Sequence, residues 1–378
     1  MTTIAIIGNT SRNIGAATAA DLALAGHRVR YAVFPEQAAQ LKPIQARGGF
    51  VVQGDPEQLV SHRSGFAELT SIGVNPIEAL EGTDLVLLDV HAPELEKRFV
   101  PLIGGLERNT VVHVQSHGYW PAARVTPYLI AAGRDDVLVT EACAPTIAAD
   151  VSTDGVVTAG ALRRDLEIAT VPGERINEAI KRLRNVIPYL QAAPSVLQTG
   201  LENFNLLVHP AMALLGVGLC EQAEARHERI RFYDACNVPS AGLLADALDD
   251  ERASVCAAYG VRHRSLPQTI DTYYGTSGAN SYDAVKNCGF YQSLGPMTST
   301  VWRGWMSVDV PYGVVPLVLL AEQAGLKAPL HRGLADIMGV VLKIDPWTTG
   351  PTLSQLGLEG SVEDVVQYAR YGKRWTSK

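Results

Sequence analysis

The sequence is poor in the features that mark several protein classes. It has five cysteines in 378 residues, and they do not form a CxxC pair. This scatter excludes a zinc ribbon and a disulfide-stapled secreted domain, and it is typical of reduced thiols in a cytoplasmic protein. We therefore expect a cytoplasmic location and no metal site. The five residues are Cys143, Cys220, Cys236, Cys256 and Cys288.

Long hydrophobic runs and an excess of positive charge are also missing. No stretch approaches the roughly 20 uninterrupted apolar residues that span a bilayer, and the first residues lack the basic region and cleavage site of a signal peptide. The net charge of −7 disfavours nucleic acids and anionic membranes as partners. Hydrophobic residues make up 47% of the chain, a globular composition. At 378 residues, we expect two domains.

The N-terminal stretch has the pattern of a buried strand, a glycine turn and a helix. Residues 4–7 are apolar and mostly β-branched, Gly8 permits a sharp exit, and the alanine-rich segment 16–25 favours a helix against which Gly15 allows close packing. Free N–H groups in the first turn of such a helix bind phosphate, so this unit predicts a dinucleotide site. The residues expected to hold the cofactor are Gly8, Asn9, Thr10, Ser11, Arg12, Asn13 and Gly15.

The dinucleotide fingerprint is incomplete in two ways. The middle glycine of G-x-G-x-x-G is absent and the loop carries two extra residues, so an ordinary βα loop without a nucleotide is the alternative. The acidic residue that holds the ribose 2′-hydroxyl of NAD is also absent, because Val33 stands near the end of the second predicted strand. This position is close in sequence to three arginines, Arg12, Arg28 and Arg30. An arginine in place of the carboxylate would suit the 2′-phosphate of NADP, so NADP is favoured, with NAD still possible. Arg28 and Arg30 are alternatively solvated strand residues.

Strands and helices alternate through the first half of the chain. Because ligands bind beyond the carboxyl ends of parallel strands, segments 8–15, 91–93 and 115–119 are expected to share one crevice. His117 lies there, as a candidate contact for cofactor or substrate or as a hydrogen-bonded turn residue. Strands are predicted at 27–34, 49–53, 66–72, 84–90, 110–114 and 137–142, helices at 76–80, about 94–103 and 174–185, and a β-hairpin at 155–170.

From about residue 200 the pattern changes to helices. The proline-containing stretch 188–199 has little periodicity and marks a domain junction. The predicted fold is an α/β Rossmann-type N-terminal domain, residues 1–188, followed by an all-α C-terminal domain, residues 189–378. Helical patterns are found at 203–228, 240–258, 311–325, 329–343 and 361–371, with a mixed pattern at 264–285.

Two stretches of the second half carry candidate catalytic residues. Asn205 and His209 are four residues apart, so they share a face of a helix, and Pro210 follows at a cost to that helix. Asp309 precedes a Val-Pro step that is expected to begin a new helix, a suitable position for a carboxylate that orients a histidine. Arg303 is a candidate anchor for a substrate carboxylate, because a guanidinium matches a carboxylate in a bidentate fork.

These motifs resemble those of the octopine/nopaline (opine) dehydrogenase family. The resemblance rests on N-x-N-x-x-x-H-P at 203–210 and D-V-P-Y-G-x-V-P at 309–316, with supporting similarity at 19–27 and 34–36, and it extends from about residue 3 to about 345. The chain departs from the family pattern in its phosphate loop and at three positions. These are Val33 at the acidic ribose position, Val308 where the family often has glutamate, and Arg303, which is offset by one.

The resemblance implies an NAD(P)H-dependent oxidoreductase acting on a CH–NH bond. An amino acid and a 2-oxo acid would form an imine, which a hydride reduces to a secondary amine. His209 would be the general acid/base and Asp309 its orienting partner, across a cleft from the nicotinamide. Asn205 would hold the substrate or the nicotinamide end, or alternatively would only cap or bridge helices. A related reductase of a carbonyl without an amine (ketopantoate reductase-like) and a non-catalytic nucleotide sensor are the alternatives. Monomer and homodimer are both open.

Overall fold

The apolar run at the start of the chain is a central strand of a large sheet. The computed structural model describes residues 1–8 and 13–372, and within them eight strands pair in the order β12-β11-β8-β7-β6-β1-β2-β5. All neighbouring strands are parallel except β11 and β8. The strands are β1 (Thr3–Gly8), β2 (Arg28–Val33), β5 (Ser71–Gly73), β6 (Leu85–Leu88), β7 (Val111–Val114), β8 (Leu138–Ala142), β11 (Glu167–Thr170) and β12 (Gln191–Ala192).

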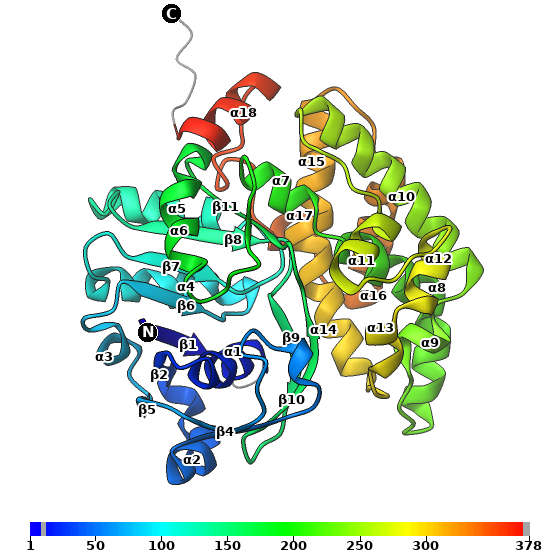
Figure 1. Ribbon diagram of the computed structural model, residues 1–378. Coiled ribbons are helices and arrows are strands. Elements are labelled where there is room, and N and C mark those ends of the chain that lie inside the picture. The colour runs from blue at the N-terminus through cyan, green and yellow to red at the C-terminus, as the bar shows by residue number, and fades with distance from the viewer. Residues whose placement is uncertain (9–12, 373–378) are drawn as a thin grey trace, which may run out of the picture. The chain divides into compact units, whose positions relative to one another are not determined.

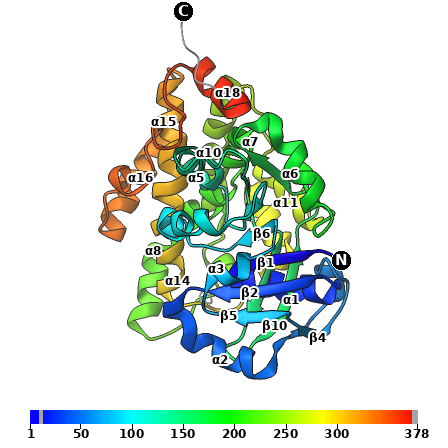
Figure 2. The same cartoon turned by 90° about the vertical axis from the view of Figure 1, so that its left-hand side faces the viewer.

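A second, four-stranded sheet covers the first helix. Its order is β4-β3-β10-β9, and α1 (Asn13–Leu24) packs against both this sheet and β1 and β2 (Figure 1). Four of the five alanines of α1 are almost fully buried, because small side chains let the helix fit between two sheets. Figure 2 shows β1, β2 and β5 side by side on the large sheet. The strands of the second sheet are β3 (Gly49–Gln53), β4 (Gly65–Glu68), β9 (Ile147–Val151) and β10 (Val156–Leu162).

Two of the strand predictions were wrong. The hairpin expected at 155–170 is formed instead by β9 and β10, and β11 leaves for the large sheet. A register shift between Ala159 and Ala161 bends β10 at Gly160, and the alternating pattern continued across that bend. The single strand expected at 66–72 is likewise two strands, β4 and β5, which belong to different sheets.

The helices around the large sheet follow the prediction with three exceptions. The helix predicted at 94–103 is broken into short pieces, and Pro93 and Pro101 are each the second residue of a 3-10 turn. Helices α2 and α5 were not predicted; α2 has a proline inside, and α5 has Pro121 at its start and Pro127 inside. These elements are α2 (Ala38–Arg47), α3 (Pro76–Leu80), η3 (Ala92–Glu94), α4 (Leu95–Phe99), η4 (Val100–Gly105), α5 (Pro121–Ala131) and α6 (Ile176–Leu183), with η1 (Pro35–Gln37), η2 (Pro56–Gln58) and η5 (Gly173–Arg175).

The C-terminal part is helical, as expected. The helix expected to begin after Asp309 does not start afresh; the chain continues through a π-helical turn, η6 (Val310–Val314), into α15 (Val315–Gln323). A π turn accepts an extra residue and so tolerates Pro311 without ending the helix. The other helices are α7 (Val196–Leu201), α8 (Asn205–Ala225), α9 (Phe232–Ala235), α10 (Pro239–Ala258), α11 (Leu266–Tyr274), α12 (Ser281–Asn287), α13 (Gly289–Ser293), α14 (Ser299–Asp309), α16 (Pro329–Leu342), α17 (Pro346–Thr349) and α18 (Val362–Tyr371).

The chain divides into two compact units. Unit 1 comprises residues 1–117 and 121–199, and unit 2 comprises residues 118–120 together with the chain from 200 onward. Three residues between β7 and α5 therefore belong to the helical unit. Trp120 packs there against Gly200, where a Cβ would lie 2.4 Å from the indole ring.

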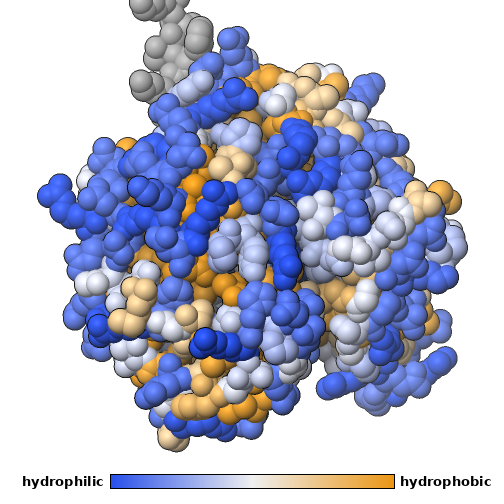
Figure 3. All heavy atoms as spheres, in the orientation of Figure 1, coloured by the Kyte–Doolittle hydropathy of each residue, from blue (hydrophilic) through white to orange (hydrophobic). Residues whose placement is uncertain are grey.

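Two helical runs are long and apolar enough to cross a membrane. They are Val196–Ala225 and Ser299–Gln323, and 72% and 78% of their most apolar windows are buried inside the structure. Most of their apolar surface is thus covered by protein, as in core helices. Hydrophilic residues cover most of the face drawn in Figure 3.

Candidate functional site

The end of β1 and the start of α1 approach each other so closely that only glycine fits. A Cβ at Gly15 would lie 2.9 Å from the Cα of Gly8 and 3.1 Å from the Cβ of Asp89. A Cβ at Gly8 would lie 2.5 Å from the hydroxyl oxygen of Tyr31. Both glycines are therefore required by packing, as in a dinucleotide-binding turn. Asn9, Thr10, Ser11 and Arg12 lie outside the described residues, as does the side chain of Asn13.

A carboxylate that sequence analysis missed fixes the start of α1. The N–H of Gly15 donates a hydrogen bond of 2.8 Å to Oδ2 of Asp89, which follows β6. A negative group near a helix N-terminus is stabilised by the helix dipole. Burial and the negative charge of Asp89 raise the pKa of Tyr31, which keeps its phenol neutral. The contact places Gly15, which belongs to the segment 8–15 expected at this edge of the sheet, against the residue that follows β6.

Arg28 and Arg30 of β2 were considered as contacts for the cofactor ribose. Arg28 pairs with Thr3 at the amino end of β2 and is exposed, so it lies at the end of the strand away from the glycine turn. Arg30 donates to the backbone carbonyl of Glu81. The positions of Arg28 and Arg30 therefore do not support the hypothesis that either contacts the cofactor ribose. Arg28 is exposed, as expected of a solvated strand residue.

Arg98, an arginine that was not predicted, contacts the residues after β2. Its guanidinium lies 4.5 Å from the centre of the Phe34 ring, and it forms ion pairs with Glu36 and, at 3.3 Å, with Glu94. Arg98 comes from α4, more than sixty residues later in the sequence, which explains why sequence proximity did not identify it. A cation and a carboxylate thus stand together where Rossmann-type folds recognise the ribose.

The predicted histidine and aspartate are joined in unit 2. Nδ1 of His209 lies 2.9 Å from Oδ2 of Asp309, and the exposed fractions of the two residues are 7% and 1%. A carboxylate can only accept a hydrogen bond, so Nδ1 carries the proton and Nε2 of the neutral ring is an acceptor. Histidine–carboxylate pairs with this geometry are used in general acid/base catalysis.

Two tyrosines that sequence analysis missed complete this cluster. The hydroxyl of Tyr119 donates to Oδ1 of Asp309, and the hydroxyl of Tyr233 lies 2.6 Å from Nε2 of His209. The Trp305 ring stacks on the imidazole at a centroid distance of 4.8 Å and an interplanar angle of 17°. Hydrogen bonds and stacking together hold the imidazole in one orientation. We call Asp309, His209, Tyr119 and Tyr233 the histidine cluster.

Local helix geometry explains how the pair meets. His209 lies in the first turns of α8, and Asp309 is the last residue of α14 before the π turn; the two helices pack together. Gly313 in the π turn brings the backbone against α8, since a Cβ there would lie 2.0 Å from a methyl carbon of Leu206. Pro210 follows His209 inside α8 without ending the helix.

The other three residues predicted to contact the substrate lie in different parts of the structure. Asn205 is buried at the start of α8, one turn before His209. Arg303 pairs instead with Glu221 at 2.8 Å, twelve residues beyond His209 on α8, or roughly 18 Å along the helix axis. The anchoring role predicted for Arg303 therefore has no support in this geometry. His117 is half-buried in unit 1 after β7.

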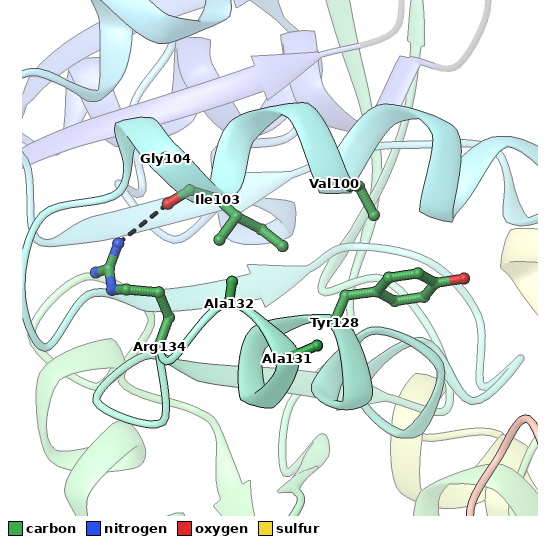
Figure 4. Close-up of a pocket in the computed structure, with 7 residues that line it drawn as sticks. All are labelled: Val100, Ile103, Gly104, Tyr128, Ala131, Ala132 and Arg134. Carbon is green, nitrogen blue, oxygen red and sulfur yellow. Dashed lines mark hydrogen bonds between the residues drawn. The ribbon is translucent and has the colours of Figure 1, made fainter.

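An open pocket of about 610 Å³ lies elsewhere in unit 1, between η4 and α5 (Figure 4). Its wall is apolar apart from the Tyr128 hydroxyl and Arg134. The guanidinium of Arg134 pairs with Asp136 and donates to the carbonyls of Ile103, Leu106 and Glu107. No metal-binding group of histidine, cysteine, aspartate or glutamate side chains is found among the described residues.

Comparison with known proteins gives consistent matches. Residues 192–342 match the family model described as NAD/NADP octopine/nopaline dehydrogenase, alpha-helical domain. An opine dehydrogenase of Arthrobacter sp. (strain 1C) is 27% identical over 350 residues, which cover 92% of this chain and 93% of the relative. Octopine dehydrogenase solved with NADH and agmatine has a TM-score of 0.74 at 16% identity and full coverage of both chains. Yersinopine dehydrogenase with NADP+ has a TM-score of 0.70 at 15% identity, covering 98% of each chain. The predicted fold class and resemblance are confirmed.

Proposed function

We propose that this chain is an NAD(P)H-dependent opine dehydrogenase that joins an amino acid to a 2-oxo acid. The proposal is supported by the match of residues 192–342 to the octopine/nopaline dehydrogenase family model and by the similarity of 92% of the chain to an opine dehydrogenase. The observation that carries the proposal is the hydrogen bond between His209 and Asp309, two residues 100 positions apart. The nearly full-length relationship to an opine dehydrogenase supports the same reaction class.

The glycine turn fits a dinucleotide. Gly8 and Gly15 leave no room for side chains, and β1 lies between β6 and β2, at the switch point where such folds bind cofactors. Gly8, the 9–13 loop and Gly15 would hold the pyrophosphate. The chemistry that a bound cofactor would supply is hydride transfer. The solved relatives carry NADH in one case and NADP+ in another, so both are candidate cofactors.

The histidine cluster would handle the proton. Asp309 holds Nδ1, so Nε2 is the nitrogen of His209 that exchanges a proton during the reaction. In the cluster Nε2 is hydrogen-bonded to the Tyr233 hydroxyl. We infer that this hydroxyl relays the proton to the amine nitrogen of the substrate. When the imidazole becomes positively charged, Asp309 stabilises it. Tyr119 holds the second oxygen of that carboxylate in place.

For the substrates, we propose a chemical class rather than individual compounds. The reaction needs an amino acid and a 2-oxo acid, and Asn205, one turn from His209, is a candidate contact for one of them. The octopine dehydrogenase structures hold agmatine, L-arginine or pyruvate, which makes pyruvate the natural first co-substrate to test. All five cysteines are free thiols in the structure, which is consistent with the cytoplasmic location that we propose.

The decisive experiment measures oxidation of NADH and of NADPH with pyruvate alone and with pyruvate plus each amino acid. Turnover that requires the amine, with a secondary amine dicarboxylate detected by mass spectrometry, supports the proposal. Turnover independent of the amine would identify a carbonyl reductase instead. His209→Ala is the control, and activity unchanged in that variant would exclude the histidine cluster from the chemistry.

A further inference from the structure

Two cysteines in unit 2 are close enough to react with each other. The sulfur atoms of Cys220 and Cys236 are 3.7 Å apart, although the residues are separated by 16 positions. Cys220 lies near the end of α8, and Cys236 follows the single turn α9. Both are free thiols, with exposed fractions of 2% and 1%. This pairing was not predicted, because the five cysteines are scattered along the sequence.

Helix α8 makes room for this contact. Gly216 lies one turn before Cys220 on the same face, and a Cβ at Gly216 would lie 2.6 Å from the sulfur of Cys236. A larger residue would push Cys236 away from α8. The glycine therefore allows the second thiol to approach the first.

The two thiols have different chemical roles. A hydrogen bond from Cys236 and the positive charge of Arg303 lower the pKa of Cys220. The hydrogen bond to Cys220 and burial raise the pKa of Cys236. Since the thiolate is the reactive form, Cys220 would react first with an oxidant and Cys236 would resolve the product.

We propose that Cys220 and Cys236 form a reversible disulfide with hydrogen peroxide as the oxidant. The Cys220 thiolate attacks one peroxide oxygen, the O–O bond breaks, and a sulfenic acid and hydroxide result. Cys236 then attacks the sulfenic sulfur and water leaves. In total two thiols are oxidised, and one peroxide takes up their two protons to become two waters. A small oxidant suits thiols that are almost fully buried.

The disulfide would act on the histidine cluster through α9. A disulfide holds its sulfur atoms about 2.05 Å apart, so the thiols have to approach by roughly 1.7 Å. Helix α8 has 21 residues, whereas α9 has four, so α9 is the element that shifts. Tyr233 lies on α9, and its hydroxyl is hydrogen-bonded to Nε2 of His209. Oxidation therefore displaces the Tyr233 hydroxyl, and its effect on turnover rests on the proposed function.

The test begins with the reduced full-length protein. It is treated with hydrogen peroxide, and free thiols are counted under denaturing conditions; non-reducing peptide mapping then identifies any cross-link. We expect loss of two of the five thiols, a cross-linked peptide containing Cys220 and Cys236, and recovery with dithiothreitol. A map without that peptide, retention of all five thiols, or only sulfinic acids would overturn the proposal. None of these readouts depends on the substrate or on turnover.

Matched variants separate the pair from other thiols. Cys236→Ser should lose the cross-link and keep its activity under peroxide, whereas Cys256→Ser, in α10, should behave like the wild type. Oxidised wild type should have a kcat about tenfold lower, as expected for loss of one hydrogen bond. A cross-link that forms while kcat stays constant would refute the coupling to His209. Absence of any turnover in the reduced protein would refute the proposed function alone.

Discussion

The hydroxyl of Tyr119 donates a hydrogen bond to Asp309, 190 residues further along the chain. Tyr119 is thus a positioning residue for the carboxylate that holds His209. We expect Tyr119→Phe to lower kcat about tenfold, because one charge-assisted hydrogen bond is lost, while the KM for NAD(P)H stays constant. Steady-state kinetics with both substrates checks this split. Tyr128→Phe, at an exposed site on α5, is the control.

Asp309→Asn should have a larger effect than the tyrosine variant. The amide keeps the shape of the side chain but removes the negative charge that stabilises the imidazolium. We expect kcat to fall by roughly 10²- to 10⁴-fold, the usual contribution of a general acid/base. Circular dichroism should show an unchanged fold. A kcat within threefold of the wild type would count against the assigned pair.

Tyr233→Phe tests the proposed proton relay. Removal of the hydroxyl leaves Nε2 of His209 without its partner in the structure, and we expect kcat to fall at least tenfold with a changed pH–rate profile. If the substrate instead displaced Tyr233 and met Nε2 directly, the variant would be as active as the wild type or more so. Either result can be read from kcat measured over a range of pH.

Gly15→Ala should impair cofactor binding. The added methyl group would meet the backbone at Gly8 and the side chain of Asp89, so the helix would have to move away from the strand. We expect the KM for NAD(P)H to rise at least tenfold and the free energy of unfolding to fall by about 1–3 kcal/mol. Gly104→Ala is the matched control in unit 1, because its Cβ would point into open space. Equal cofactor KM values in the two variants would contradict the close-packed turn.

Glu141 should make stability depend on pH. Burial raises the pKa of this carboxyl from 4.5 to about 7, against hydrogen bonds from Thr199 and the backbone of Ala122 and Ala123. The folded protein thus keeps a proton that the unfolded chain releases near pH 4.5. The free energy of unfolding should therefore fall as pH rises from about 4.5 to 7, by on the order of 3 kcal/mol, and level off above.

Glu141→Gln isolates this effect. The neutral amide can still accept from Ala122 and can donate to the Thr199 hydroxyl. Urea unfolding at about pH 5 and pH 8 should show a smaller difference for the variant than for the wild type. Identical pH dependence in the two proteins would assign the effect to other groups.

The sequence predicted elements well where one short pattern determined the structure. The apolar runs that became β1, β6 and β8, and the periodic segments that became α8, α10 and α16, are found where expected. Local patterns failed where pairing depends on distant partners. Nothing in residues 155–170 indicates that β10 and β11 enter different sheets, and the prolines of α5 concealed a helix that tertiary packing stabilises.

The candidate site divides in the same way. His209 and Asp309 could be identified because each is part of a motif with unusual prolines. Tyr119, Tyr233 and Arg98 could not, because no local pattern distinguishes a tyrosine or arginine that meets its partner only after folding. The cysteine pair was concealed for the same reason. Chemical type is visible in a sequence, whereas the partner of a side chain is set by topology.

Residues 118–120 have a consequence for protein engineering. They belong to the helical unit although the α/β unit precedes and follows them in the chain. A hybrid enzyme spliced at residue 200 would combine the Tyr119 of one parent with the Asp309 of the other. A graft intended to transfer substrate preference should therefore include this tripeptide. A fragment expressed from residue 200 alone would lack the phenol that steadies its aspartate.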